Sequence, residues 1–177
     1  MSRVNLDTQR SPAASQPLLE QIDRAFGATP NMFKAVSNSP AALQSMWAAF
    51  GALGKGTIGA LLGEQIAVAI ANRNRCEYCL AAHTALGQNA GATAVQMGEA
   101  QVGRSADART AAALDFALKV VEQRAQVSEL DVAALRSAGF DDEQAVEILA
   151  HVALNLFTNY VNVALDVPVD FPKVALK

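Results

Sequence analysis

The sequence holds few of the features that mark a secreted or membrane protein. It has two cysteines in 177 residues, too few for a disulfide framework. Its richest apolar run, 58–71, is interrupted by Glu64 and Gln65, and no run approaches the roughly 20 residues that span a bilayer. The N-terminus lacks the basic-then-apolar pattern of a secretory signal. We therefore expect a cytoplasmic protein with no membrane partner.

Charge of either sign is also scarce, at 18% of residues with a net charge of −3. Basic residues do not cluster beyond the spaced Arg73 and Arg75, so we expect no nucleic-acid partner. The glycine-rich segment 51–57 is no phosphate loop, because Gly56 follows Lys55 where Ser or Thr is needed. No flavin, haem or nicotinamide site is visible either, so the predicted cofactor content is none.

Strict alternation of polar and apolar residues, the pattern of a half-buried strand, is absent too. Apolar residues recur at helical spacing, and Pro17, Ser128 and Asp141 stand where helices typically begin. The predicted class is an all-α, single-domain multi-helix bundle over residues 17–177, preceded by a polar N-terminal arm, 1–16. The expected helices cover 17–26, a short stretch between Pro30 and Pro40, 41–53, 58–73, a segment from about 76, 93–101, 106–126, 128–137 and 141–165.

What the chain does contain is a dense cluster of reactive side chains. Both cysteines and one of the two histidines lie within residues 76–83, Cys-Glu-Tyr-Cys-Leu-Ala-Ala-His. On a helix, Cys76, Cys79 and His83 share one face because they are three and four residues apart. Asn72 or Asn74 is expected to cap this helix, which would put Cys76 in its first turn, where the helix dipole favours a thiolate. The cluster predicts thiol redox chemistry or a metal site.

Glu64 is a candidate third member of this site. It lies on the preceding helix among small apolar residues, where a carboxylate is costly to bury without a partner. If the two helices form a hairpin, His83 is the expected partner of Glu64, and pairing with the carboxylate makes the imidazole a better base. Otherwise Glu64 faces solvent. The same four groups would suit zinc. Structural zinc sites usually draw a second ligand pair from a distant segment, and this chain has none, so we predict no metal.

A second polar cluster lies on the last predicted helix. His151, Asn155, Thr158 and Asn162 form a stripe at helical spacing. Such a stripe is typical of a hydrogen-bonded core or a subunit contact, and it would also suit the polar wall of an active-site cavity. The large aromatic residues Phe33, Trp47 and Phe50 are expected in the core rather than around a substrate.

The spacing of the reactive residues resembles a known signature. The pattern resembles the motif of the alkyl hydroperoxidase D family, within the carboxymuconolactone decarboxylase-like superfamily. It consists of Glu64, eleven residues, Cys76-x-x-Cys79, three residues and His83. Segments 29–33, 159–162 and 170–172 are similar to the ends of its longer, peroxidase-related members. Where the best-known members often carry a histidine, this chain has Tyr78, a possible weaker proton donor.

The resemblance implies a thiol-dependent peroxidase or disulfide reductase acting on hydroperoxides. Glu64 polarises His83, His83 takes the proton of Cys79, Cys79 attacks the peroxide, and Cys76 closes the disulfide. An external dithiol or protein reductant then restores both thiols. The position of Cys76 nearer the helix N-terminus instead favours that thiol as the attacking group, while the step of four to His83 favours Cys79.

Two other functions and one assembly state follow from the same residues. Carboxymuconolactone decarboxylation is known in the superfamily but needs no dithiol, and a non-enzymatic redox adaptor or sensor would use the dithiol alone. An alanine-rich chain with so few charges leaves apolar surface to cover, which predicts a homo-oligomer. The resemblance implies a trimer or a hexamer.

Overall fold

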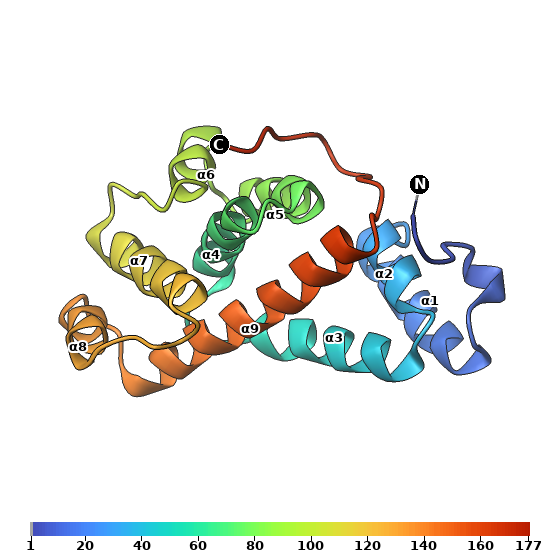
Figure 1. Cartoon of the computed structure of the whole chain (residues 1–177), viewed down its shortest axis with the longest axis horizontal. Coiled ribbons are helices and arrows are strands. Elements are labelled where there is room, and N and C mark those ends of the chain that lie inside the picture. Colours follow the sequence, from blue (N-terminus) through green and yellow to red (C-terminus); the bar gives the residue numbers. More distant parts are fainter. Residues whose placement is uncertain (1) are drawn as a thin grey trace.

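The computed structural model describes residues 2–177, and this part of the chain is helical without any strand. The all-α prediction is confirmed, and most predicted ranges overlap the observed helices. In Figure 1 the long helix α9 runs diagonally across the molecule, with α4 and α5 in the centre and α1–α3 at the opposite end from α8. The helices are α1 (Gln16–Phe26), α2 (Asn31–Val36), α3 (Pro40–Leu53), α4 (Ala60–Arg73), α5 (Glu77–Asn89), α6 (Ala94–Ala100), α7 (Ala108–Glu122), α8 (Glu129–Ser137) and α9 (Asp142–Ala164).

Short-range sequence signals set the helix ends. Ser128 and Asp141 form capping boxes at the starts of α8 and α9, as predicted. The prediction that Asn72 or Asn74 caps the thiol helix is wrong. Cys76 is itself the N-cap of α5, and its sulfur accepts a hydrogen bond from the Cys79 N–H at 3.3 Å.

The reason for this difference lies in the turn between α4 and α5. Helix α4 continues to Arg73, so Asn72 lies in its last turn and Asn74 is its C-cap. Arg75 then takes a left-handed conformation with φ 54°, which reverses the chain within a short turn. Cys76 follows in extended conformation, with φ −91° and ψ 92°, and is therefore the residue that meets the free N–H groups of α5.

Helix α4 is the central element of the core. It packs against α5, α7 and α9, and Ile66, Val68 and Ile70 are completely buried in it. Its approach to α5 is close: a Cβ atom at Gly87 of α5 would lie 3.4 Å from the Cβ of Glu64 and 2.6 Å from Met97 Sδ. The 3.4 Å distance is an ordinary contact, so Glu64 of α4 lies directly against α5, and the space that glycine leaves open is filled by Met97 of α6. No helix within residues 2–177 is long and apolar enough to cross a membrane.

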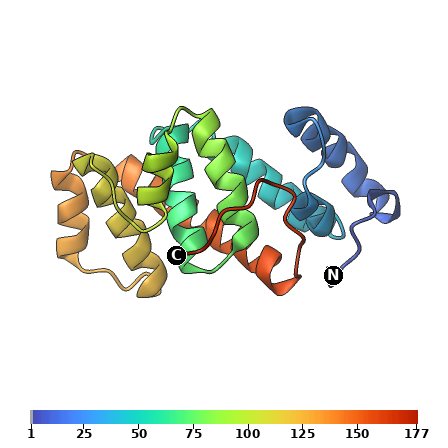
Figure 2. The same ribbon diagram turned by 90° about the horizontal axis from the view of Figure 1, so that it is seen from above.

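Both ends of the chain return to the helical body. The tail after α9 passes over α5 to reach α6, as Figures 1 and 2 show from two directions. Arg3 N donates to Leu165 O at 2.8 Å, and Ser15 Oγ donates to Ser37 O at 2.8 Å. Met1 of the predicted arm 1–16 lies outside the described residues. The arm's other residues contact the body in this way, and the proposed division of the chain at residue 16 stays a prediction.

Candidate active site

The two thiols lie side by side at the start of α5, and both are buried and unbridged. Cys79 faces α9, where Asn162 Nδ2 donates to Cys79 Sγ at 3.2 Å. The Cys79 thiol donates a longer hydrogen bond, 4.0 Å, to Thr158 Oγ1. Two members of the polar stripe thus surround the sulfur. Of the alternatives left open for the stripe, this part of it is a hydrogen-bonded part of the core that contacts the thiol.

His83 lies one turn beyond Cys79 and is hydrogen-bonded to Glu64. The distance from His83 Nδ1 to Glu64 Oε2 is 2.7 Å, and His83 is only 8% exposed. The bond to the carboxylate places the proton of a neutral imidazole on Nδ1 and leaves Nε2 as the basic nitrogen. The structure therefore brings together Glu64, His83, Cys79 and Cys76, the four residues that the sequence motif singles out.

The groups around the two thiols shift their pKa values in opposite directions. Burial by itself raises the pKa of Cys79, but the hydrogen bond from Cys76, the charge of His83 and the hydrogen bonds of Asn162 and Thr158 together lower that pKa to about 6. The hydrogen bond with Cys79, together with burial, raises the pKa of Cys76. Near neutral pH the pair therefore carries one negative charge, centred on Cys79, while Cys76 keeps its proton.

The charge of His83 is supported by the carboxylate. Burial acts to lower the pKa of His83, but the charge of Glu64, the hydrogen bond to it and the charge of Cys79 outweigh burial and raise that pKa. A cationic imidazole beside a thiolate is the arrangement that favours both charged forms. The site is therefore built to hold a reactive thiolate next to a proton donor.

Cys79 and Cys76 line different openings. Cys79 lines a cavity of about 270 Å³ together with His83 and Glu64. Cys76 lines a separate depression of about 200 Å³, whose walls include Arg75, Glu77 and Asn162. The first opening is largely apolar and the second carries charged side chains. The apolar cavity thus borders Cys79 and the polar depression borders Cys76, and both residues are almost fully buried, at 2% and 1% exposure.

The expectation that Phe33, Trp47 and Phe50 belong to the core is confirmed, because Phe33 lies in the core and the other two pack against it. Phe33 is buried in the core, yet all three residues line the cavity at Cys79, and Trp47 and Phe50 are only partly buried. Helical periodicity identifies which residues face inward but does not show whether the inward face closes on protein or on a cavity. The remaining wall residues are Ala25, Phe26, Met32, Ala82, Leu86 and Phe171. Met32 and Phe171 lie in the segments 29–33 and 170–172 that the resemblance singled out, and no sequence signal indicated the other four.

Tyr78 presents its ring to the cavity and its hydroxyl to the backbone of α2. The hydroxyl accepts a hydrogen bond from Met32 N at 3.1 Å, and the ring meets Phe171 edge-on with centroids 5.8 Å apart. Burial is the main cause that raises the pKa of Tyr78, so the phenol stays protonated at neutral pH. Its hydroxyl therefore ties α2 to α5.

The other half of the polar stripe lies behind the Glu64–His83 pair. His151 and Asn155 line an adjoining cavity of about 140 Å³ that Glu64 and His83 also border. Burial lowers the pKa of His151, so its ring is neutral at neutral pH, and its Nε2 atom is buried without a partner. Asn155 Nδ2 donates to the main-chain oxygen of His151 at 2.9 Å. These two residues do not touch the thiol.

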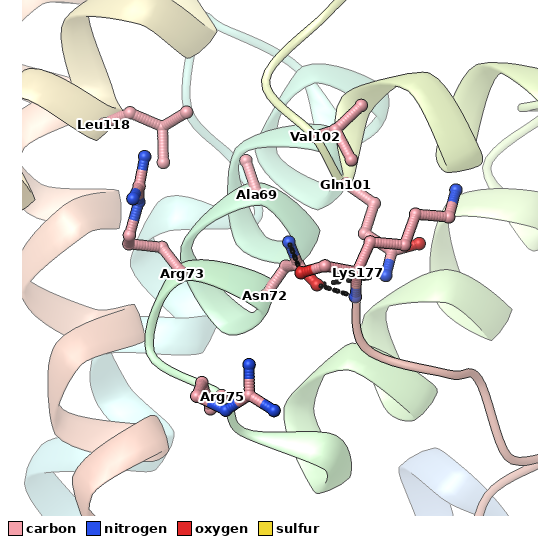
Figure 3. A pocket seen from close by; sticks show the side chains of 8 residues that line it. All are labelled: Ala69, Asn72, Arg73, Arg75, Gln101, Val102, Leu118 and Lys177. Atoms are coloured by element: carbon pink, nitrogen blue, oxygen red, sulfur yellow. Dashed lines mark hydrogen bonds between the residues drawn. The ribbon is translucent and has the colours of Figure 1, made fainter.

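A further cavity, of about 340 Å³, lies apart from the thiols between α4, α6, α7 and the tail (Figure 3). Its cationic side chains are Arg73, Arg75 and Lys177, and Arg73 is paired with Glu122. Lys177 N donates to Asn72 Oδ1 at 2.9 Å, a contact drawn in Figure 3. This cavity therefore marks where the tail joins α4. Within residues 2–177, no three His, Cys, Asp or Glu side chains are grouped so as to hold a metal ion.

Comparison with known proteins identifies the class to which this fold and site belong. The sequence model of the carboxymuconolactone decarboxylase family matches residues 40–123, a range that includes Glu64, Cys76, Cys79 and His83. The structure of an uncharacterized peroxidase-related protein from Silicibacter sp. TM1040 has 27% sequence identity and a TM-score of 0.82, with 98% of this chain and 92% of that chain covered.

Two further solved structures are similar. One is an alkylhydroperoxidase AhpD core, an uncharacterized peroxidase-related protein from Ralstonia eutropha JMP134, with 28% identity, a TM-score of 0.84, and 96% of this chain and 92% of that chain covered. The other is the debrominase Bmp8 in complex with 2,3,4-tribromopyrrole, which is similar in fold. It has 20% identity and a TM-score of 0.78, with 96% of this chain and 94% of that chain covered. No curated protein matches the chain significantly.

The fold and the buried Cys-x-x-Cys pair therefore define an alkyl hydroperoxidase D-like helical protein. The match of residues 40–123 to the carboxymuconolactone decarboxylase family model and the two peroxidase-related structures agree with the resemblance that the sequence motif predicted. Helices α1 and α2, α9 and the tail lie outside the residues that the family model matches.

Proposed function

We propose that this protein is a thiol-dependent peroxidase that reduces organic hydroperoxides through Cys79 and Cys76. The observation that carries the proposal is the environment of Cys79. This buried thiol lies beside the His83–Glu64 pair, accepts a hydrogen bond from Asn162 and belongs to a residue that lines a cavity. A thiolate is the nucleophile in this chemistry, and this site favours the thiolate at Cys79.

The first half-reaction oxidises Cys79. Its thiolate attacks the terminal oxygen of the hydroperoxide, an S–O bond forms and the O–O bond breaks. The sulfur loses two electrons and becomes a sulfenic acid, while the peroxide is reduced to an alkoxide. His83, which holds the proton taken from the Cys79 thiol, gives it to the alkoxide, and an alcohol leaves. Glu64 keeps the imidazole oriented through the 2.7 Å bond to Nδ1.

The second half-reaction uses Cys76. Its sulfur attacks the sulfenic sulfur of Cys79, the S–O bond breaks, and the departing hydroxide takes the Cys76 proton to form water. The product is a Cys76–Cys79 disulfide. An external dithiol then reduces it by exchange and is itself oxidised to a disulfide. Because Cys76 lines the polar depression, it is the sulfur that we expect the donor to attack.

The test is a single-turnover experiment on the reduced protein. One equivalent of hydroperoxide should yield one equivalent of alcohol, remove both thiols per chain and leave a disulfide within one peptide by mass spectrometry; a dithiol should restore both thiols. Cys76→Ser should still give one alcohol and leave a sulfenic acid that dimedone traps. Cys79→Ser should give none. Thiols that survive hydroperoxide, or zinc released in equal amount by a chelator, would contradict the proposal.

A redox adaptor is the second candidate, because the polar depression at Cys76 would serve disulfide exchange with a partner equally well. It predicts a different result in the same experiment. An adaptor would exchange its disulfide with dithiols quickly but would form no alcohol from hydroperoxide in a single turnover. Formation of alcohol that depends on Cys79 excludes the adaptor role as the sole activity.

A further inference from the structure

Aromatic side chains are concentrated around the cavity at Cys79. The sequence contains seven Phe, two Tyr and one Trp, only 6% of its residues. Six of these side chains line this single cavity, which composition alone does not explain. They come from α1, α2, α3, α5 and the tail, and they are Phe26, Phe33, Trp47, Phe50, Tyr78 and Phe171.

The rings form two groups on the cavity wall. Phe33 is the centre of the larger one, with centroids 5.7 Å from Trp47 and 5.9 Å from Phe50, both edge-on. Tyr78 and Phe171 form the smaller group, also edge-on. Edge-on and offset contacts are the favoured geometries between aromatic rings. A ring that entered the cavity would find aromatic edges and faces of the same kind as those already paired in its wall.

The polar groups that line the cavity are its reactive residues. Cys79 and the bonded pair of Glu64 and His83 supply them, because the Tyr78 hydroxyl is occupied by the backbone of α2. A hydroperoxide whose O–O group meets Cys79 therefore leaves its organic group against aromatic walls. Hydrogen peroxide has no organic group and gains nothing from them. The volume of about 270 Å³ lies just below the range of roughly 300–1,000 Å³ for ligand pockets, so it suits a compact group.

We infer that the cavity selects hydroperoxides that carry one aromatic ring, and that Phe33, Trp47 and Phe50 determine this specificity; the inference rests on the proposed peroxidase function. The reactive residues all lie within the part of the chain that the family model matches, residues 40–123. Phe26, Phe33 and Phe171 lie outside it. Segments flanking the shared reactive core thus supply much of the wall that contacts the organic group.

Trp47 makes the inference testable without any turnover, because it is the single tryptophan of the chain and lines the cavity. The probe is 2-phenyl-2-propanol, the alcohol formed from cumene hydroperoxide, titrated into the reduced protein. Trp47 emission should change and saturate, with half-saturation at least about tenfold lower than for tert-butanol. Phe50→Leu, which keeps the reporter, should raise the half-saturation concentration about three- to tenfold.

Phe116→Leu is the matched control, because Phe116 is buried in α7, at 4% exposure, and does not line the cavity. It should leave the half-saturation concentration unchanged. If neither alcohol changes Trp47 emission, or both do so equally, or Phe50→Leu and Phe116→Leu behave alike, the aromatic specificity is overturned.

Turnover separates this inference from the proposed function. The ratio of kcat/KM for cumene hydroperoxide to that for hydrogen peroxide should exceed about ten and fall in Phe50→Leu but not in Phe116→Leu. Equal reduction of both peroxides would overturn the specificity and leave the peroxidase function standing. If the aryl alcohol binds but no hydroperoxide is reduced, the peroxidase function fails, and the assignment of a hydroperoxide to the cavity fails with it.

Discussion

We expect the reactivity of Cys79 to depend on the charge of His83, one turn away on α5. Replacing His83 with Gln keeps a hydrogen-bonding side chain beside Glu64 but removes the positive charge, so we expect the pKa of Cys79 to rise from about 6. Because the thiolate is the reacting form, alkylation of Cys79 by iodoacetamide should rise with pH through that pKa in the wild type. At pH 7 the first unit of pKa increase should slow the variant about twofold, and each further unit should slow it by a factor that approaches about tenfold. A pH–rate profile, with circular dichroism to verify folding, measures this.

Glu64→Gln should act in the same direction through His83. The carboxylate raises the pKa of His83 by its charge and hydrogen bond, so the amide variant should hold the imidazolium only at lower pH. The profile of Cys79 alkylation should shift upward by less than in His83→Gln. If Cys79 reacts equally fast in both variants and the wild type, the proton relay is wrong and Glu64 serves packing.

The lowered pKa of Cys79 also makes stability depend on pH. Its pKa is about 6 in the folded chain against a reference value of 9.0, so the folded state binds fewer protons than the unfolded state between these values. The contribution of the thiolate to stability is full above pH 9 and is lost as the pH falls through about 6. The difference in free energy of unfolding between reduced wild type and Cys79→Ser should therefore grow from pH 6 to pH 9. A difference that stays flat across this window would contradict the assigned shift.

At the scale of elements, Gly87 of α5 determines how closely α6 packs against the helix that carries Cys79 and His83, because Met97 of α6 fills the space beside it. In Gly87→Ala the new methyl group would lie 2.6 Å from Met97 Sδ, a buried side chain that must then move. We expect a loss of about 1–3 kcal/mol in the free energy of unfolding. Gly51→Ala in α3 is the matched control: its Cβ meets nothing within 4 Å, so it should stabilise by up to about 1 kcal/mol. Urea unfolding of both variants decides; equal effects would refute the packing argument.

Local signals explain which elements could be predicted from the sequence. Ser128 and Asp141 are ordinary caps and were placed correctly. The start of α5 was misplaced because its cap is a thiol, which rarely has that role, and because the left-handed turn is made by Arg75, whereas glycine or asparagine would have signalled it.

Contacts between distant elements explain what could not be predicted. Cys79 and His83 share a face of α5 because helical periodicity requires it, and Cys76 joins them as the N-cap, through the hydrogen bond from Cys79 N to its sulfur. Asn162 reaches Cys79 from 83 residues away, and only the crossing of α9 over α5 brings the two together. The stripe on α9 could be recognised as polar, but its partner could not. The same limit applies to Phe33, since an apolar face is equally suited to a core and to a cavity wall.

At the scale of the whole molecule, α9 has a polar stripe on its inward face and an apolar stripe on its outward face. The inward face carries Asn155, Thr158 and Asn162 to the site region. Every exposed residue of α9 after Glu143 is apolar or aromatic, and several are large, with Val146 at 65% and Tyr160 at 63% exposure. A continuous apolar stripe of this length is typical of a surface that another chain covers. Its members are Val146, Leu149, Ala153, Phe157, Tyr160, Val163 and Ala164.

We propose that copies of this chain associate through the outward stripe of α9. Light scattering at micromolar concentration should then give a multiple of the 18.6 kDa chain mass. We expect a trimer or hexamer, the states that the family resemblance implies, rather than a dimer.

Phe157→Glu, in the middle of the stripe, should shift the population toward monomer because a carboxylate is costly to bury in an apolar interface. Leu130→Glu is the matched control, since Leu130 is 80% exposed on α8 and lies outside the stripe. A monomeric wild type, or equal dissociation of both variants, would remove α9 as the interface. Because Asn162 and Thr158 lie on the inward face of the same helix, dissociation by Phe157→Glu should also slow Cys79 alkylation if assembly holds α9 against α5.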